Sequence, residues 1–183
     1  MYNDAPTYYQ PNVIPQAALS VDQMEMFNAF IARITNPVAP IEELRSLFMN
    51  PVPPKIGQIK CTIIRHKGGL NRWWPKYTLQ LSENNKFLLT GKKRSGNKTS
   101  NYLISLDQAK ESKNSQGYLG KVRSNFLGTE FYIYDNGENP DKAKSHEAIR
   151  NQHGVVQYET NVLGSKGPRR MKVLLPNVDL QGN

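Results

Sequence analysis

The chain has 183 residues, a formal net charge of +9 and an isoelectric point near 9.6. Residues 1–55 carry a net charge of −2 and residues 56–183 carry +11, so the second part is expected to meet an anionic partner: lipid headgroups, nucleic acid or an acidic protein. One cysteine excludes a disulfide framework and a zinc site built on several thiolates, and is typical of a reducing compartment. The chain opens with no signal-peptide pattern and contains no run of 18 apolar residues, so neither standard secretion nor a membrane span is expected.

The first part of the chain predicts short helices rather than strands. Ser20 and Gln23 have the spacing of a capping box, and apolar residues follow at helical spacing, which predicts an amphipathic helix over 20–35. A second short helix is predicted at Ile41–Phe48, after Pro40. The expected organisation is a disordered tail (1–18), short amphipathic helices (19–50), a proline-rich linker (51–57) and a β domain (58–183).

From Ile59 onward, short strand-like runs alternate with turn residues, which predicts an antiparallel sheet or barrel. The predicted strands cover residues 59–65, 77–81, 87–90, 101–106, 131–134, 155–158 and 171–175, and the segment 117–137 holds two strand-like runs. Cys61 belongs to the first of these strands and is expected to be buried. Residues 141–151 fit either a short surface helix or a loop.

Two basic pairs are the main candidates for a binding site. Lys92 and Arg94 are two residues apart at the end of a strand and share one face, whereas Lys93 points to the other. Two cations on one face can bind two phosphate groups, although lysines also protect edge strands against aggregation. Lys121 and Arg123 repeat the same spacing, so both pairs are expected to line one pocket.

The adjacent residues Trp73 and Trp74 cannot both be buried readily if they lie in a strand. The exposed one is expected to cover apolar surface, to enter a membrane interface or to stack on a base. No catalytic residue, metal site or cofactor is expected, because the histidines lack partners at ligand spacing and no nucleophile or phosphate-loop motif is present.

Four segments resemble the carboxy-terminal domain of the tubby family, in the family's order and across about residues 58–176. They are IKCTIIRHKGG (59–69), LLTGKKRSGNKTSNYLIS (88–105), GYLGKVRSNFLGTEFYIYDNG (117–137) and VQYETNVLGSKGPRRMKVLLP (156–176). The resemblance implies a β-barrel threaded by a central apolar helix. It also implies that the chain binds phosphoinositides, chiefly phosphatidylinositol 4,5-bisphosphate, at the inner face of the plasma membrane.

By this resemblance Lys92, Arg94 and Arg123 match the positions that contact the headgroup phosphates, with Lys93 and Lys121 contributing to the positive field. The resemblance further implies a cytoplasmic protein held peripherally on the plasma membrane, with the nucleus and the cilium as further locations. It also implies membrane-protein cargo carried through an amino-terminal segment.

The chain departs from the family pattern after VLLP, because the further strands and the carboxy-terminal helix do not follow. An incomplete barrel is therefore expected, with the helix at 20–35 as a substitute for the missing core element. Two alternatives stay open. One is a DNA-binding or transcription-associated protein that uses the same basic surface, and the other is a tubby-like fragment without a competent site.

Overall fold

The computed structural model describes residues 19–159 and 170–177, and an antiparallel sheet of eight strands dominates it. The predicted tail (1–18) lies outside the described residues. The strands are β1 (Cys61–His66), β2 (Lys76–Leu81), β3 (Phe87–Lys93), β4 (Asn101–Ser105), β5 (Tyr118–Ser124), β6 (Glu130–Asp135), β7 (Gln152–Tyr158) and β8 (Met171–Leu174). The helical elements are α1 (Val21–Ile34), α2 (Ile41–Met49) and the 3₁₀ turns η2 (Pro54–Ile56), η3 (Gly69–Arg72) and η4 (His146–Ala148).

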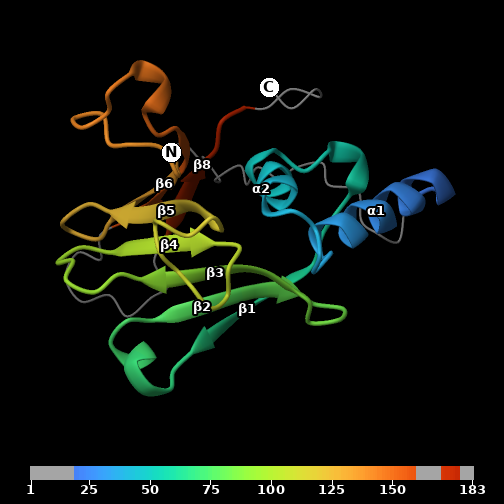
Figure 1. Cartoon of the computed structure of the whole chain (residues 1–183), viewed down its shortest axis with the longest axis horizontal. Coiled ribbons are helices and arrows are strands. Elements are labelled where there is room, and N and C mark those ends of the chain that lie inside the picture. Colours follow the sequence, from blue (N-terminus) through green and yellow to red (C-terminus); the bar gives the residue numbers. More distant parts are fainter. Residues whose placement is uncertain (1–18, 160–169, 178–183) are drawn as a thin grey trace, which may run out of the picture.

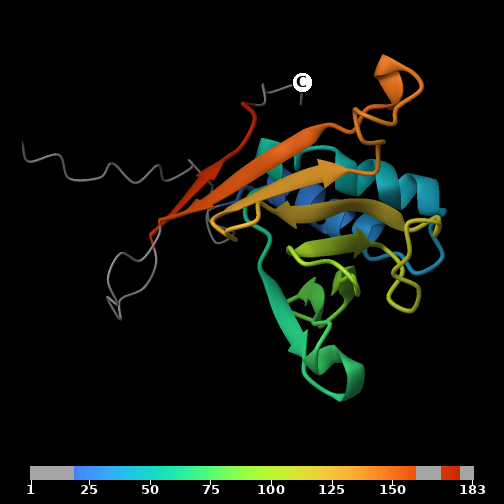
Figure 2. The same cartoon turned by 90° about the vertical axis from the view of Figure 1, so that its left-hand side faces the viewer.

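The strands follow one another in the sheet in chain order, from β1 to β8, and every neighbouring pair is antiparallel. Figures 1 and 2 show the sheet curled into a half-barrel, with α1 and α2 beside one end of the strands. The prediction of a mainly β, incomplete barrel preceded by short helices is therefore confirmed.

The first helix begins where the sequence predicts. Ser20 is its N-cap and forms a full capping box with Gln23. Ile34, at the other end of α1, packs against Leu81 and Leu88 in the buried core, and so holds the helices to β2 and β3.

The two faces of the sheet differ in character. Leu89, Ile104, Leu119 and Ile133 line an apolar hollow of about 600 Å³ that Phe48 of α2 also borders. The helix at 20–35, expected as the substitute core element, does not line this hollow: α1 packs on the ends of β2 and β3, and α2 borders the hollow instead. The opposite face, here called the polar face, carries Lys92, Lys121 and Arg123, whereas the strand register places Lys93 on the apolar face.

Three local predictions have clear outcomes. The prediction that Cys61 is buried is wrong, because β1 is an edge strand and Cys61 is exposed on it. Trp73 is exposed and Trp74 is half-buried, as expected for adjacent residues, although both follow η3 rather than lying in a strand. Residues 141–151 form a loop that contains η4.

Candidate functional site

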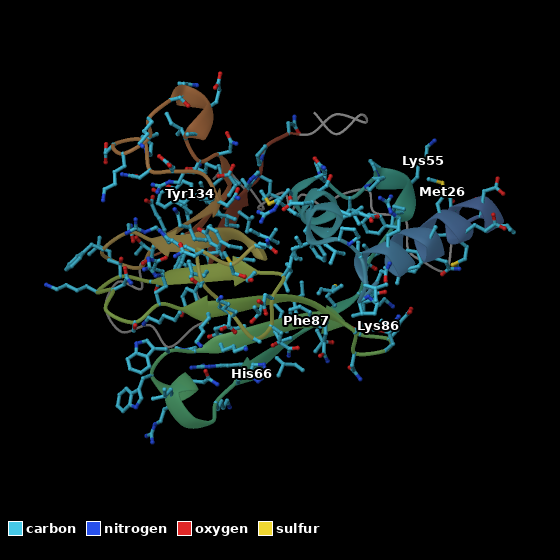
Figure 3. All side chains as sticks on the ribbon, viewed as in Figure 1. Met26, Lys55, His66, Lys86, Phe87 and Tyr134 are labelled. Atoms are coloured by element: carbon cyan, nitrogen blue, oxygen red, sulfur yellow. The ribbon has the colours of Figure 1, made fainter. Side chains whose placement is uncertain are left out.

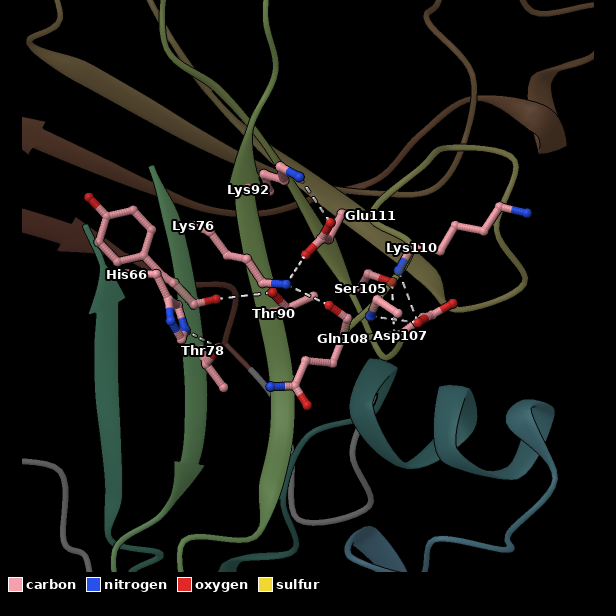
Figure 4. A network of polar contacts seen from close by, with 12 residues as sticks. His66, Lys76, Thr78, Thr90, Lys92, Ser105, Asp107, Gln108, Lys110 and Glu111 are labelled. Carbon is pink, nitrogen blue, oxygen red and sulfur yellow. Dashed lines mark hydrogen bonds and ion pairs between the residues drawn. The ribbon is translucent and has the colours of Figure 1, made fainter. Parts of the chain in front are cut away.

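The connection between β4 and β5, here called the strap (residues 106–117), folds back over the polar face. Its anchor is Glu111, whose side chain is 3% exposed and forms ion pairs with Lys76 (2.5 Å) and Lys92 (3.4 Å), as Figure 4 shows. Lys76 also donates a hydrogen bond to the backbone oxygen of Gln108 (2.6 Å). Burial acts to raise the pKa of Glu111, but the hydrogen bonds from Lys76 and its own backbone and the charges of Lys76 and Lys92 outweigh burial, so the pKa is lowered.

Two hollows lie beside the strap, and Arg94 and Lys113 border both of them. The first, here called the Lys92 hollow, has a volume of about 620 Å³. Its lining comprises Leu70, Asn71, Trp74, Lys92, Lys93, Arg94, Ser95, Leu103 and Glu111 to Asn114. Because the carboxylate of Glu111 already pairs with Lys92, the positive charge available to a ligand in this hollow is partly neutralised.

The second, here called the Lys121 hollow, has a volume of about 730 Å³ and is far more basic. Its basic lining residues are Arg45, Arg94, Lys113, Lys121, Arg123, Lys142, Lys144 and Arg150, and its acidic one is Glu138. Of these cations, Arg45 alone forms an ion pair within the described part of the chain. A hollow with this charge is complementary to a ligand that carries several negative charges.

Strand pairing explains why these cations gather. Lys121 of β5 lies opposite Leu103 of β4, and Arg123 lies opposite Asn101. Lys92 of β3 lies opposite Leu103 on its other side, so Lys92, Leu103 and Lys121 form one row across the sheet. Arg94 follows Lys92 by two residues and therefore shares the polar face with Arg123.

Lys121 is the buried member of this cluster, with the residue only 5% exposed. Burial first, and then the charges of Arg150, Lys113 and Arg123, lower its pKa from an ordinary value of 10.5 to about 8, although Asp135 acts in the other direction. Burial followed by the charges of Arg94 and Arg123 also lowers the pKa of Lys113. Such mutual repulsion is relieved when an anion binds between the cations.

The connection between β6 and β7 brings Arg150 to the site. Buried Asp135, at the end of β6, accepts hydrogen bonds from the backbone of Gly137 (2.9 Å) and from the backbone and side chain of Asn151 (3.0 and 2.8 Å). These bonds join the two ends of the connection. Arg150 then lies over the ring of Tyr134 on β6, 4.2 Å from its centroid; Figure 3 labels Tyr134 at this position.

Two buried polar atoms in the Lys121 hollow have no hydrogen-bond partner among the described residues. They are the hydroxyl oxygen of Tyr118 and Oδ1 of Asn101. Buried polar atoms are usually paired, so these two are free to contact a ligand that carries both acceptor and donor groups.

The structure therefore divides the candidate residues between the hollows. Arg94, Lys121 and Arg123 line the Lys121 hollow, whereas Lys92 and Lys93 line the Lys92 hollow, where Arg94 also lies. Sequence reasoning missed the other basic lining residues and the charge partner of Lys92. Positions far apart in the sequence supply them, on the strap, on α2 and on the β6–β7 connection: Arg45, Glu111, Lys113, Lys142, Lys144 and Arg150.

Comparison with known proteins identifies the family. The family model described as Tub family matches residues 48–183. The chain belongs to the Tub family.

Curated relatives of the Tub family agree with this assignment. The chain is 46% identical to mouse Tubby-related protein 2 over 145 residues, which are 75% of the chain and 26% of the relative. It is 40% identical to human Tubby-related protein 1 over 153 residues (81% of the chain, 28% of the relative). It is 46% identical to Tubby protein homolog 1 of Caenorhabditis elegans over 127 residues (66% and 30%). The chain thus spans between about a quarter and a third of the length of these relatives.

As a class, proteins of the Tub family are not enzymes. Within residues 19–159 and 170–177, no cluster of three or more His, Cys, Asp or Glu side chains is placed to hold a metal ion. Among the same residues, no helix has the length and apolar character needed to cross a bilayer.

Proposed function

We propose that this Tub family chain is a non-enzymatic phosphoinositide-binding module, selective chiefly for phosphatidylinositol 4,5-bisphosphate. The observation that carries the proposal is the Lys121 hollow, where cations from the β3–β4 connection, the strap, β5 and the β6–β7 connection surround one space and form no ion pair within the described part of the chain. A bisphosphorylated inositol ring has the charge to relieve their repulsion and the hydroxyl groups to contact Tyr118 and Asn101.

The phosphate ligands proposed are Lys92, Arg94 and Arg123, with Lys93 and Lys121 contributing to the field. Arg94 borders both hollows, so a headgroup that reaches across it is within range of Lys92 on one side and Arg123 on the other. Glu111 competes with the ligand for Lys92, so Arg94 and Arg123 should contribute more than Lys92 to phosphate binding.

Co-sedimentation with phosphatidylcholine vesicles, with and without phosphatidylinositol 4,5-bisphosphate, tests the proposal. The double variant Arg94→Ala/Arg123→Ala should lose binding by at least about 100-fold, because each guanidinium–phosphate contact contributes about 1.5 to 3 kcal/mol. The control Lys60→Ala/Lys86→Ala removes the same charge from exposed positions outside both hollows and should keep nearly full binding. Equal losses in the two double variants would mean that only net charge matters.

The same experiment separates the alternatives. A DNA-binding protein that uses general basic charge would bind duplex DNA with a steep salt dependence, and either double variant would weaken it alike. A folded chain that ignores both ligands would fit a fragment without a competent site. Under the proposed function, the protein is held peripherally on the inner plasma membrane, with the nucleus and cilium as further locations and membrane-protein cargo as a partner.

A further inference from the structure

Three connections that the structure describes in full meet at one side of the molecule, here called the loop edge: residues 67–75, 94–100 and 125–129. The antiparallel pairing requires this, since His66 pairs with Lys76, Lys76 with Lys92, and Asn101 with Arg123. In Figure 1 these connections lie along the left-hand side, which Figure 2 turns toward the viewer.

Large apolar side chains project from two of these connections. Leu70 and Trp73 in the first, and Phe126 and Leu127 in the third, are between 70% and 84% exposed. Exposed apolar residues grouped at loop tips are uncommon in a protein that remains in water, and they indicate a surface that another phase or molecule covers.

The tip at 125–129 is held rigidly. Oδ1 of Asn125 accepts hydrogen bonds from the backbone of Thr129 (3.0 Å) and Glu130 (3.3 Å), and Nδ2 of Asn125 donates to Oγ1 of Thr129 (2.9 Å). Gly128, with φ of 69°, closes the turn. Phe126 and Leu127 therefore point outward without a further loss of backbone entropy when they are covered.

The two ends of the strands differ in net charge. The loop edge contains the cations Lys67, Arg72, Arg94 and Lys98 and no acidic residue. The connections at the opposite end (82–86, 106–117 and 136–151) hold six acidic and six basic residues, so their formal charges balance, and Glu159 begins the β7–β8 connection at the same end as the loop edge. The guanidinium of Arg72 also lies 5.9 Å from the ring centre of Trp73, so an aromatic and a cation share one tip.

We propose that the loop edge is a membrane-insertion surface, with the apolar tips entering the interface of an anionic bilayer and the cations at the level of the lipid phosphates. The inference rests on the proposed phosphoinositide function and deepens it, because it sets how the protein meets the membrane that carries its ligand.

Two features favour a bilayer over a protein partner. The apolar residues form two separate tips with cations between them, whereas protein interfaces centre on one contiguous buried patch. A fluid interface accommodates separate tips, and it favours tryptophan together with basic residues. The tips also adjoin the proposed ligand site, since Leu70 lines the Lys92 hollow and Phe126 follows Arg123 by three residues.

Tryptophan quenching tests insertion directly. The chain has two tryptophans, so the variant Trp74→Phe leaves Trp73 as the reporter. Vesicles of phosphatidylcholine, phosphatidylserine and phosphatidylinositol 4,5-bisphosphate with brominated acyl chains should quench its fluorescence on binding. Binding without quenching would contradict insertion.

The double variant Phe126→Ser/Leu127→Ser tests the second tip. Both side chains are more than three-quarters exposed, so the folded state loses little packing. Partitioning onto these vesicles should fall at least about tenfold, since two apolar side chains no longer enter the interface. Affinity for soluble inositol 1,4,5-trisphosphate, which reports on the ligand site alone, should not change.

The matched control is Val21→Ser/Val38→Ser, which removes apolar side chains that are 76% and 85% exposed but lie outside the loop edge. It should leave vesicle partitioning unchanged. Normal vesicle binding by the Phe126→Ser/Leu127→Ser variant would overturn the insertion surface and assign the tips to a protein partner or self-association. Failure of the wild-type chain to bind the soluble trisphosphate would instead overturn the proposed function.

Discussion

Replacing Lys121 by methionine should stabilise the unliganded fold while weakening ligand binding. The folded state holds this ammonium in a buried site among Arg123, Arg150 and Lys113, which lowers its pKa from 10.5 to about 8. That difference corresponds to an unfavourable contribution of about 3 kcal/mol at neutral pH, because the lysine is charged in both the folded and the unfolded chain there. Methionine keeps the aliphatic stem and removes the charge, so the free energy of unfolding should rise by about 1 to 3 kcal/mol.

Thermal unfolding at pH 7 measures this effect, with an expected rise in Tm of about 3 to 8 °C. The pH dependence of the free energy of unfolding should show the same effect of Lys121. Between pH 8 and 10.5 the unfolded chain holds the lysine proton and the folded chain does not, so Lys121 makes the free energy of unfolding rise with pH in that range. The Lys121→Met variant should lack this contribution.

The control is Lys86→Met, which makes the same substitution at an exposed lysine and should change the free energy of unfolding by less than about 0.5 kcal/mol. Binding to vesicles with phosphatidylinositol 4,5-bisphosphate should fall in Lys121→Met and persist in Lys86→Met. The reasoning would be refuted by a Lys121→Met protein that is less stable than the wild type at pH 7, or that binds the lipid equally well.

Three further predictions follow from the same geometry. Ligand affinity should decline as pH rises from 7 to 9, since Lys121 loses its proton near pH 8, and calorimetric titration of inositol 1,4,5-trisphosphate should show proton uptake on binding. Glu111→Gln should lower the free energy of unfolding by about 1 to 3 kcal/mol at pH 7 and speed hydrogen exchange in the strap. Because the pKa of Glu111 is lowered, the wild type should lose its greater stability over the variant on acidification below about pH 4.5. An unchanged rate of hydrogen exchange in the strap of Glu111→Gln would contradict the role of Glu111 as anchor. Gly120→Ala should lower the free energy of unfolding by at least about 3 kcal/mol, because its Cβ would lie 2.1 Å from the backbone oxygen of Tyr134, whereas Gly68→Ala meets nothing within 4 Å and should be neutral in the same denaturant titration.

Local patterns in the sequence predicted the scaffold well. The capping box at Ser20 and the turn residues between the strands act over a few positions, so they are visible without tertiary information. The same holds for the shared face of Lys92 and Arg94, which follows from the two-residue period of a strand. The burial of Cys61 was mispredicted because an apolar run does not show whether its strand lies at the edge of the sheet.

The full candidate site could not be predicted because long connections complete it. Neither the strap nor the β6–β7 connection has a periodic pattern, and each is positioned by tertiary contacts, one through Glu111 and the other through Asp135. A carboxylate that pairs with two lysines from other strands has no signature in its own neighbourhood. The position of Arg150 over the ring of Tyr134 likewise depends on the conformation of the β6–β7 connection, which the local sequence does not show.

The order of the strands also has a consequence for how the molecule forms. Each strand pairs with the strands immediately before and after it in the chain, from β1 through β8. Each strand therefore finds its partner nearby in the sequence, and no strand waits for a partner from a remote part of the chain. We expect the sheet to grow hairpin by hairpin in the direction of synthesis, with the row of Lys92, Leu103 and Lys121 across β3, β4 and β5 assembled before β8 leaves the ribosome.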